Sequence, residues 1–121
     1  MSLTLTSRQT EEGFVVIEPE GRLTLYTANE MDSFLSQCIS SGKANIILLG
    51  GKLNYIDNFG IGLVVNYQKN AKNLGGQIVL AGLQKRQVDL LNITGLNKLF
   101  TICGTLEEAL EALRKLNTPH A

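Results

Sequence analysis

Hydrophobic and polar residues alternate along the start of the chain and then give way to short, continuous apolar runs. Residues 3–8 place Leu3 and Leu5 against threonine and arginine, which predicts a strand with one face in solvent. The sequence Glu11-Glu12-Gly13 is typical of a hairpin turn, and the apolar run Phe14-Val15-Val16-Ile17 predicts the partner strand. Further apolar runs predict three more strands, at residues 44–49, 77–82 and 99–103.

Apolar residues at helical spacing predict a first helix after this hairpin. It begins at Thr27, because Thr27 and Glu30 fit a capping box, and it ends at Ser41-Gly42. Pro19 and Gly21 precede it, and they mark either the end of the second strand or a bulge within that strand. The stripe expected to face the core consists of Met31, Phe34, Leu35, Cys38 and Ile39.

Three more helices are predicted farther along the chain. The second runs from Asp57-Asn58 to Leu74-Gly75-Gly76, where glycine suits the left-handed closing residue. The third covers residues 84–93, and the fourth begins at Thr105, with Glu108 completing a second capping box. Residues at helical spacing in the second helix are Ile61, Val64, Val65, Gln68, Ala71 and Lys72. In the third helix the same spacing predicts that Val88 and Leu91 point inward. In the fourth it predicts a core-facing stripe of Leu106, Ala109, Leu110, Leu113 and Leu116.

The predicted elements follow the order β-β-α-β-α-β-α-β-α. Helical crossovers between strands imply parallel pairing, whereas the opening hairpin adds an antiparallel edge. The predicted fold class is therefore α/β, with a mostly parallel central sheet and helices packed on it. We expect residues 1–116 to form a single domain and residues 117–121 to fray as a C-terminal tail.

The polar pair Asp57-Asn58 lies where the chain turns from the buried strand at 44–49 into the second helix. Both residue types cap helix N-termini well, since their side-chain oxygens accept from free backbone N–H groups. The helix dipole also favours the negative charge of Asp57 at this point. We therefore expect polar groups to be presented at the rim of the sheet, where α/β domains commonly bind their ligands and partners.

Composition limits the classes of function. The chain has 121 residues and equal numbers of basic and acidic residues, 11 of each, so no basic field suggests a nucleic-acid partner. No apolar run approaches the ~20 residues that span a bilayer, and the N-terminus lacks the pattern of a secretory signal. Cys38 and Cys103 are far apart in sequence, and we expect both to be reduced and buried. These features predict a cytoplasmic protein without membrane insertion.

Three kinds of catalytic or cofactor chemistry fit the sequence poorly. The only histidine is His120, in the predicted tail, which argues against histidine-based catalysis and a metal cluster. Gly60-Ile61-Gly62 lacks the third glycine of a dinucleotide-binding loop, because Val65 stands there, so close helix–sheet packing explains these glycines better. A receiver-type phosphorylation of Asp57 would need further acidic residues to hold magnesium, and Glu20 offers only one carboxylate. We expect no cofactor.

The order and spacing of several short motifs resemble the STAS domain family over nearly the whole chain, in the form of a stand-alone bacterial anti-sigma factor antagonist. The matching segments are Gly21-Arg22-Leu23, the turn from Tyr55 to Gly62, Gly75-Gly76, Ala81-Gly82-Leu83, Leu91 with Thr94-Gly95-Leu96, and Leu106-Glu107-Glu108-Ala109. Each motif alone is weak, but the ordered set is specific.

The family's signature is Asp-Ser/Thr-Ser/Ala-Gly-Leu/Ile, whose first hydroxyl residue is phosphorylated by a partner anti-sigma factor kinase. Asp57 and Gly60-Ile61 fit this signature, but Asn58 replaces the phospho-acceptor and Phe59 replaces the small residue. Asparagine has no hydroxyl to esterify, so it cannot gain the charge of a phosphate. Phe59 is either an exposed anchor for a partner or ordinary packing against Leu25 or Tyr55.

The resemblance implies a non-enzymatic regulatory module that binds a protein partner. The partner-binding residues it suggests are Thr24, Asp57, Asn58, Phe59, Gly60 and Ile61, where Thr24 stands in place of a common aspartate. The implied partner is an anti-sigma factor kinase-like protein or another STAS or sensor protein, and a homodimer stays open. The alternatives are a scaffold or adaptor in a sensory assembly or transport system, and a small-ligand-binding α/β domain.

Overall fold

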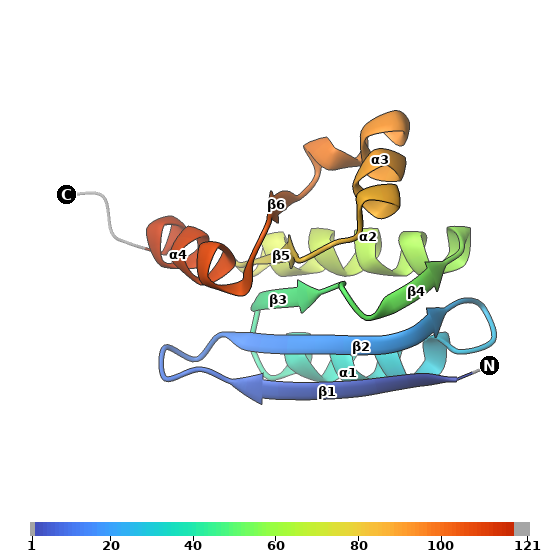
Figure 1. Cartoon of the computed structure of the whole chain (residues 1–121). Coiled ribbons are helices and arrows are strands. Elements are labelled where there is room, and N and C mark those ends of the chain that lie inside the picture. Colours follow the sequence, from blue (N-terminus) through green and yellow to red (C-terminus); the bar gives the residue numbers. More distant parts are fainter. Residues whose placement is uncertain (1, 118–121) are drawn as a thin grey trace.

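The computed structural model describes residues 2–117, which form a sheet with helices on both of its faces (Figure 1). The elements are β1 Leu3–Gln9, β2 Val15–Leu23, α1 Ala28–Ser40, β3 Asn45–Leu49, β4 Leu53–Ile56, α2 Asn58–Asn73, β5 Gln77–Ala81, α3 Lys85–Thr94, the 3-10 helix η1 Leu96–Lys98, β6 Thr101–Cys103 and α4 Leu106–Leu116. The predicted fold class is confirmed. His120 and the rest of the predicted tail beyond Asn117 lie outside the described residues.

The sheet has the strand order β1-β2-β3-β5-β6, with β4 paired to β2. Among the strand pairs of residues 2–117, only the β1–β2 pair is antiparallel. The strand β4 is absent from the sequence-based order of elements. It pairs with β2 beyond an irregularity between Gly21 and Arg22, so the bulge alternative for Pro19 and Gly21 is correct and β2 continues to Leu23.

Alternate residues of the central strands enter two separate cores. Ile46 of β3 and Ile78 of β5 pack beneath α1 and α2, together with Met31 and Leu35. The neighbouring residues Ile47 and Val79 point to the other face, where Ala109 and Leu113 of α4 cover them. This double burial explains why β3 and β5 read as continuous apolar runs rather than as alternating strands.

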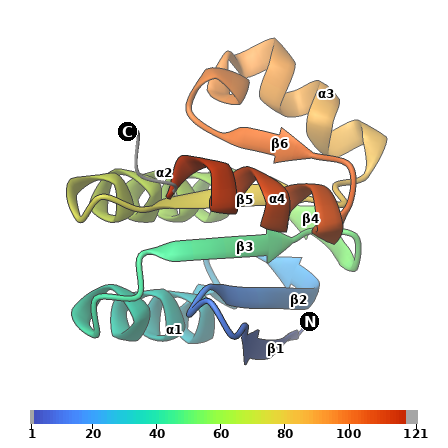
Figure 2. The same ribbon diagram turned by 90° about the vertical axis from the view of Figure 1, so that its left-hand side faces the viewer.

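The helix α3 is placed differently from the other helices. Figures 1 and 2 show it projecting outward near β6, whereas α1, α2 and α4 lie along the sheet. Gln87 is its only buried residue, and α3 packs chiefly on η1. Val88 and Leu91 were expected inward, and both are only partly buried.

Two expectations about core residues need correction. Leu116 was expected to face the core, but it is 54% exposed because it lies at the last turn of α4, beyond the packed part of the helix. Both cysteines are free, and only Cys38 is buried, whereas Cys103 on the short strand β6 is half-buried.

Candidate protein-docking site

Asp57 is the centre of the candidate site, and it caps α2 as predicted. Its Oδ1 accepts a hydrogen bond from the Gly60 N–H at 2.8 Å, and its Oδ2 accepts from the Leu25 N–H at 3.1 Å. The Asp57 N–H in turn donates to the Leu23 carbonyl oxygen at 3.1 Å. One residue therefore fixes the start of α2 and joins it to the β2–α1 loop.

These contacts also stabilise the charge of Asp57. The hydrogen bond from Gly60 is the main cause that lowers the pKa of the Asp57 carboxyl below its usual value, and that from Leu25 adds to it. Because the accepted N–H groups favour the carboxylate over the neutral acid, Asp57 is ionised at neutral pH.

Gly60 lets α2 approach β2 closely. A Cβ atom at position 60 would lie 2.8 Å from the Leu23 carbonyl oxygen and 2.9 Å from Ile56 Cγ1, closer than real contacts allow. The packing explanation for Gly60 is thus confirmed. For Gly62 it is wrong, since a Cβ there would meet nothing within 4 Å. Ile61 lies between them and is partly buried.

Asn58 is the first residue of α2 and not its cap. Its side chain is exposed at the helix start, and the capping role predicted for both members of the pair belongs to Asp57 alone. The amide of Asn58 is therefore presented to solvent on a helix turn that Asp57 holds in place.

The β2–α1 loop is held by threonine hydroxyls. Thr24 is 5% exposed, and its Oγ1 accepts from the Tyr26 N–H at 3.2 Å, so Thr24 shapes the loop from inside. Thr27 Oγ1 donates to the Arg22 carbonyl oxygen at 2.6 Å and accepts from the Thr24 N–H at 2.9 Å. The capping box predicted for Thr27 and Glu30 is therefore wrong, because the Thr27 hydroxyl makes its hydrogen bonds within the β2–α1 loop.

Large apolar side chains surround the Asp57 cap and stay exposed. Phe59 is 48% exposed, so its burial as ordinary packing is not observed, and Tyr55 is 45% exposed with the Arg22 guanidinium 4.4 Å from its ring centre. Leu25 and Tyr26 of the adjoining loop are 55% and 82% exposed. We call Leu25, Tyr26, Tyr55, Asn58 and Phe59 the docking rim.

Sequence analysis did not assign Leu25 and Tyr26 to the site. The available signal was an apolar pair in a turn between two threonines, where no helix or strand periodicity buries it.

In the described chain, residues 2–117, no group of three or more His, Cys, Asp or Glu side chains is placed to hold a metal ion. Over the same residues, no helix combines the length and apolar character needed to cross a bilayer.

Comparison with known proteins defines the class. The STAS domain family matches residues 6–109, so the chain belongs to the STAS domain family. Over 104 residues it is 28% identical to a TM1081 homologue of Thermotoga neapolitana that is named as a candidate anti-sigma factor antagonist, covering 85% of this chain and 92% of the relative. The anti-sigma-B factor antagonist of Staphylococcus aureus is 27% identical over 93 residues, 77% of this chain and 86% of the relative.

Solved structures agree with this fold. The crystal structure of TM1081 from Thermotoga maritima superposes with a TM-score of 0.85 at 23% identity, over 91% of this chain and 94% of that chain. The anti-sigma factor antagonist SpoIIAA in its unphosphorylated form gives a TM-score of 0.73 at 20% identity, over 92% and 98% of the two chains. SpoIIAA of Bacillus is also solved in a phosphorylated form, with the same TM-score of 0.73.

Proposed function

We propose that this chain is a non-enzymatic regulatory module of the anti-sigma factor antagonist type, which binds a protein partner through the docking rim and is not switched by phosphorylation at position 58. The partner is an anti-sigma factor kinase-like protein or another STAS or sensor protein. The observation that carries the proposal is the group of exposed apolar side chains held around the fixed helix start at Asp57.

The docking rim has the composition of a protein-binding surface. Aromatic residues dominate the energetics of interfaces, because they bury a large area at a small cost in conformational entropy. The backbone that carries Leu25 and Phe59 is fixed by the two hydrogen bonds of Asp57, so little further ordering is needed on binding. Phe59 and Tyr26 are accordingly the proposed anchors, with Thr24, Gly60 and Ile61 supporting them from beneath.

Position 58 distinguishes this chain from an antagonist whose partner binding is switched by phosphorylation. SpoIIAA exists in unphosphorylated and phosphorylated forms. Asn58 here presents an amide, which resembles an unmodified serine in being polar and neutral and cannot accept phosphoryl. Among the nearby hydroxyls, that of Thr27 donates to the Arg22 carbonyl oxygen and Thr24 is buried, whereas Tyr26 and Tyr55 are exposed.

Calorimetric titration against each purified kinase-type anti-sigma factor from the same genome tests the binding function. Phe59→Ala should weaken binding at least tenfold, about 1.4 kcal/mol, as expected for an interface anchor. Leu116→Ala provides the control, since Leu116 is similarly exposed but lies on α4, and its affinity should stay within about twofold. Equal effects of the two substitutions would contradict the docking rim. Saturable binding only to a component of a sensory assembly or transport system would favour the scaffold alternative.

Incubation with ATP and the partner kinase tests the missing switch. The wild type should take up no phosphate at position 58, and Asn58→Ser should gain a hydroxyl at the helix start, where the dipole favours an incoming anion. Asn58→Ser with Phe59→Ser is the fairer acceptor, because it also removes the bulky side chain next to the new hydroxyl. Phosphate on wild-type Tyr55, Tyr26, Thr24 or Thr27, accompanied by loss of binding, would show by mass spectrometry that the switch has another site.

A further inference from the structure

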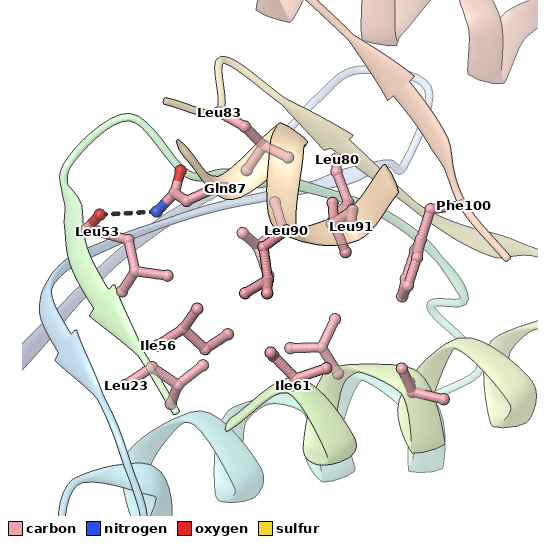
Figure 3. A pocket seen from close by; sticks show the side chains of 13 residues that line it. Leu23, Leu53, Ile56, Ile61, Leu80, Leu83, Gln87, Leu90, Leu91 and Phe100 are labelled. Carbon is pink, nitrogen blue, oxygen red and sulfur yellow. Dashed lines mark hydrogen bonds between the residues drawn. The ribbon is translucent and has the colours of Figure 1, made fainter. Parts of the chain in front are cut away.

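An apolar cavity lies between α2, α3 and the adjoining strands, behind the docking rim. Thirteen side chains line it, and its volume is about 60 Å³ (Figure 3). Leu53 and Ile56 of β4 form one wall, Ile61 of α2 forms the floor, and Leu90 and Leu91 of α3 enter from the opposite side. The helix α3 projects from the sheet in Figure 1, and the cavity lies between this helix and α2.

The lining carries no charge and no free polar group. Twelve of the thirteen side chains are hydrocarbon, and Gln87 is the exception. Gln87 Nε2 donates to the Leu53 carbonyl oxygen at 2.8 Å, and its Oε1 accepts from the Gln84 N–H at 2.8 Å. The amide of Gln87 therefore serves to hold α3 against β4 and is already hydrogen-bonded on both sides.

These walls select the chemistry of an occupant. A water molecule needs two or more polar partners to enter a protein cavity, and an ion or polar group would lose its hydration without compensation. A hydrocarbon chain is favoured, because its apolar surface is removed from water when it packs against the apolar walls. The volume is smaller than the ~150 Å³ of an engineered cavity that holds benzene, so a slender chain fits better than a ring.

The cavity also has a route to solvent along α3. Leu90 lines the cavity and is 37% exposed, and Ile93 one turn farther along α3 is 83% exposed. The first turn of α3 is held by side-chain hydrogen bonds from Gln84 to the Gly51 carbonyl oxygen, at 3.1 Å, and from Gln87 to that of Leu53. The second half of α3 has no such bond from a cavity-lining residue, because the side chains of Leu90 and Leu91 have no polar atom.

We propose that this cavity binds a short alkyl chain, which enters between Leu90 and Ile61 and occupies the space between Leu53 and Phe100. The chain is either a small uncharged molecule or the terminal segment of an amphiphile whose polar head stays in solvent. The cavity contains no residue of the docking rim and shares only Ile61 with the residues proposed to support it. The test below reads methyl groups other than that of Ile61, so failure of this proposal and failure of the proposed function are distinguishable.

Titration of the full chain with 1-octanol and with octanoate, followed by methyl-resolved NMR, tests the site. Saturable shifts are expected at the methyl groups of Leu53, Ile56, Leu80 and Leu91, with unchanged shifts at Leu113 in the core beneath α4. Binding of both probes identifies the end of an amphiphile as the natural type of ligand, and binding of 1-octanol alone identifies an uncharged molecule. Non-saturable shifts, or shifts spread over both cores, would overturn the proposal.

Matched leucine substitutions give the site its control. Leu90→Phe adds a ring at the entrance and should weaken binding of 1-octanol at least tenfold, whereas Leu116→Phe on α4 should leave it unchanged. Val65→Phe fills the cavity from α2 and should have the same effect as Leu90→Phe, so the test survives if one variant does not fold. Binding of wild-type strength in a folded Leu90→Phe or Val65→Phe variant would overturn the assignment.

Discussion

The helix α2 has two very different neighbours at its N-terminal half. On the side of β2 and the β2–α1 loop, the packing leaves no space for a single extra carbon at Gly60, and Asp57 fixes both backbones by hydrogen bonds. On the side of α3, Ile61, Val64 and Val65 border a cavity of about 60 Å³. Residues one turn apart on the same helix therefore meet a tightly packed wall and an unfilled space.

This difference separates two ways of binding. At the docking rim the backbone is rigid and the apolar side chains point outward, which suits a partner that brings its own apolar surface. At the cavity the apolar side chains point inward, and side-chain hydrogen bonds hold only the first turn of the covering helix, which suits a small apolar molecule. The predictions below test both sides of α2, from the largest expected effect to the smallest.

The largest expected effect comes from a methyl group added at Gly60. Gly60→Ala forces the new Cβ toward the Leu23 carbonyl oxygen, and we expect a loss of about 2 kcal/mol in the free energy of unfolding. Gly62→Ala is the matched control, because its Cβ meets nothing and alanine favours the helix by about 0.5–1 kcal/mol. Urea denaturation of both variants should give changes of opposite sign. Two stabilising changes would disprove the close approach of α2 to β2.

The next effect concerns the hydrogen bonds of Asp57. Asp57→Ala should lower the free energy of unfolding by about 1 kcal/mol, since the cap is lost, and it should also weaken partner binding because Leu25 is released. Thr105→Ala removes a comparable cap, in which Thr105 accepts from the Glu108 N–H at 3.2 Å, far from the docking rim. Both variants should lose similar stability in chemical denaturation. Equal partner affinity of the two would remove Asp57 from the binding site.

Local sequence patterns predicted the parts of the fold that local forces determine. The apolar stripe of α1 and the helix end at Gly75, where φ is +82°, follow from spacing and from residue type. The strand β4 was missed because its four residues, Leu53–Ile56, follow Gly50-Gly51 and have too little periodicity of their own. β4 exists through pairing with β2, whose partner residues lie 32 or 33 positions earlier in the sequence, and no window of adjacent residues contains that information.

The candidate site was predictable at its centre and not at its edges. Asp57 is identified by residue type and by its position between a strand and a helix. The capping box at Thr27 was predicted wrongly from its sequence context. In the folded chain the Thr27 hydroxyl instead donates a hydrogen bond to the Arg22 carbonyl oxygen. The cavity depends on where α3 lies relative to α2. The amphipathic pattern of α3 predicted Leu91 as an inward residue but also Val88, which does not line the cavity, and it did not identify Leu90.

A smaller effect should follow from one methylene added on the open side of α2. Val65→Ile places that group toward the cavity, and we expect a gain of about 0.5 kcal/mol in the free energy of unfolding. Val79→Ile is the control on β5, where Val79 is fully buried beneath α4, and overpacking there should cost about 1 kcal/mol. Denaturant unfolding under one set of conditions compares the two. A loss at position 65 as large as that at position 79 would show that the space beside α2 is already filled.

The smallest effect is the dependence of the cap on pH. Since the pKa of Asp57 in the folded chain is below its usual value of 3.8, the carboxylate contributes stability that is present above that value and is lost as the pH falls through the folded pKa. Asp57→Asn keeps an oxygen that can accept from the Gly60 N–H but has no charge to lose. The wild type should therefore exceed Asp57→Asn in free energy of unfolding at pH 7, and the difference should shrink below about pH 4. Glu12 also has a lowered pKa, through its hydrogen bond with Arg114, so Glu12→Gln is measured alongside to separate the two contributions. A difference between wild type and Asp57→Asn that is the same at pH 7 and pH 3 would mean that the hydrogen bonds of Asp57, and not its charge, hold the start of α2 on the tight side.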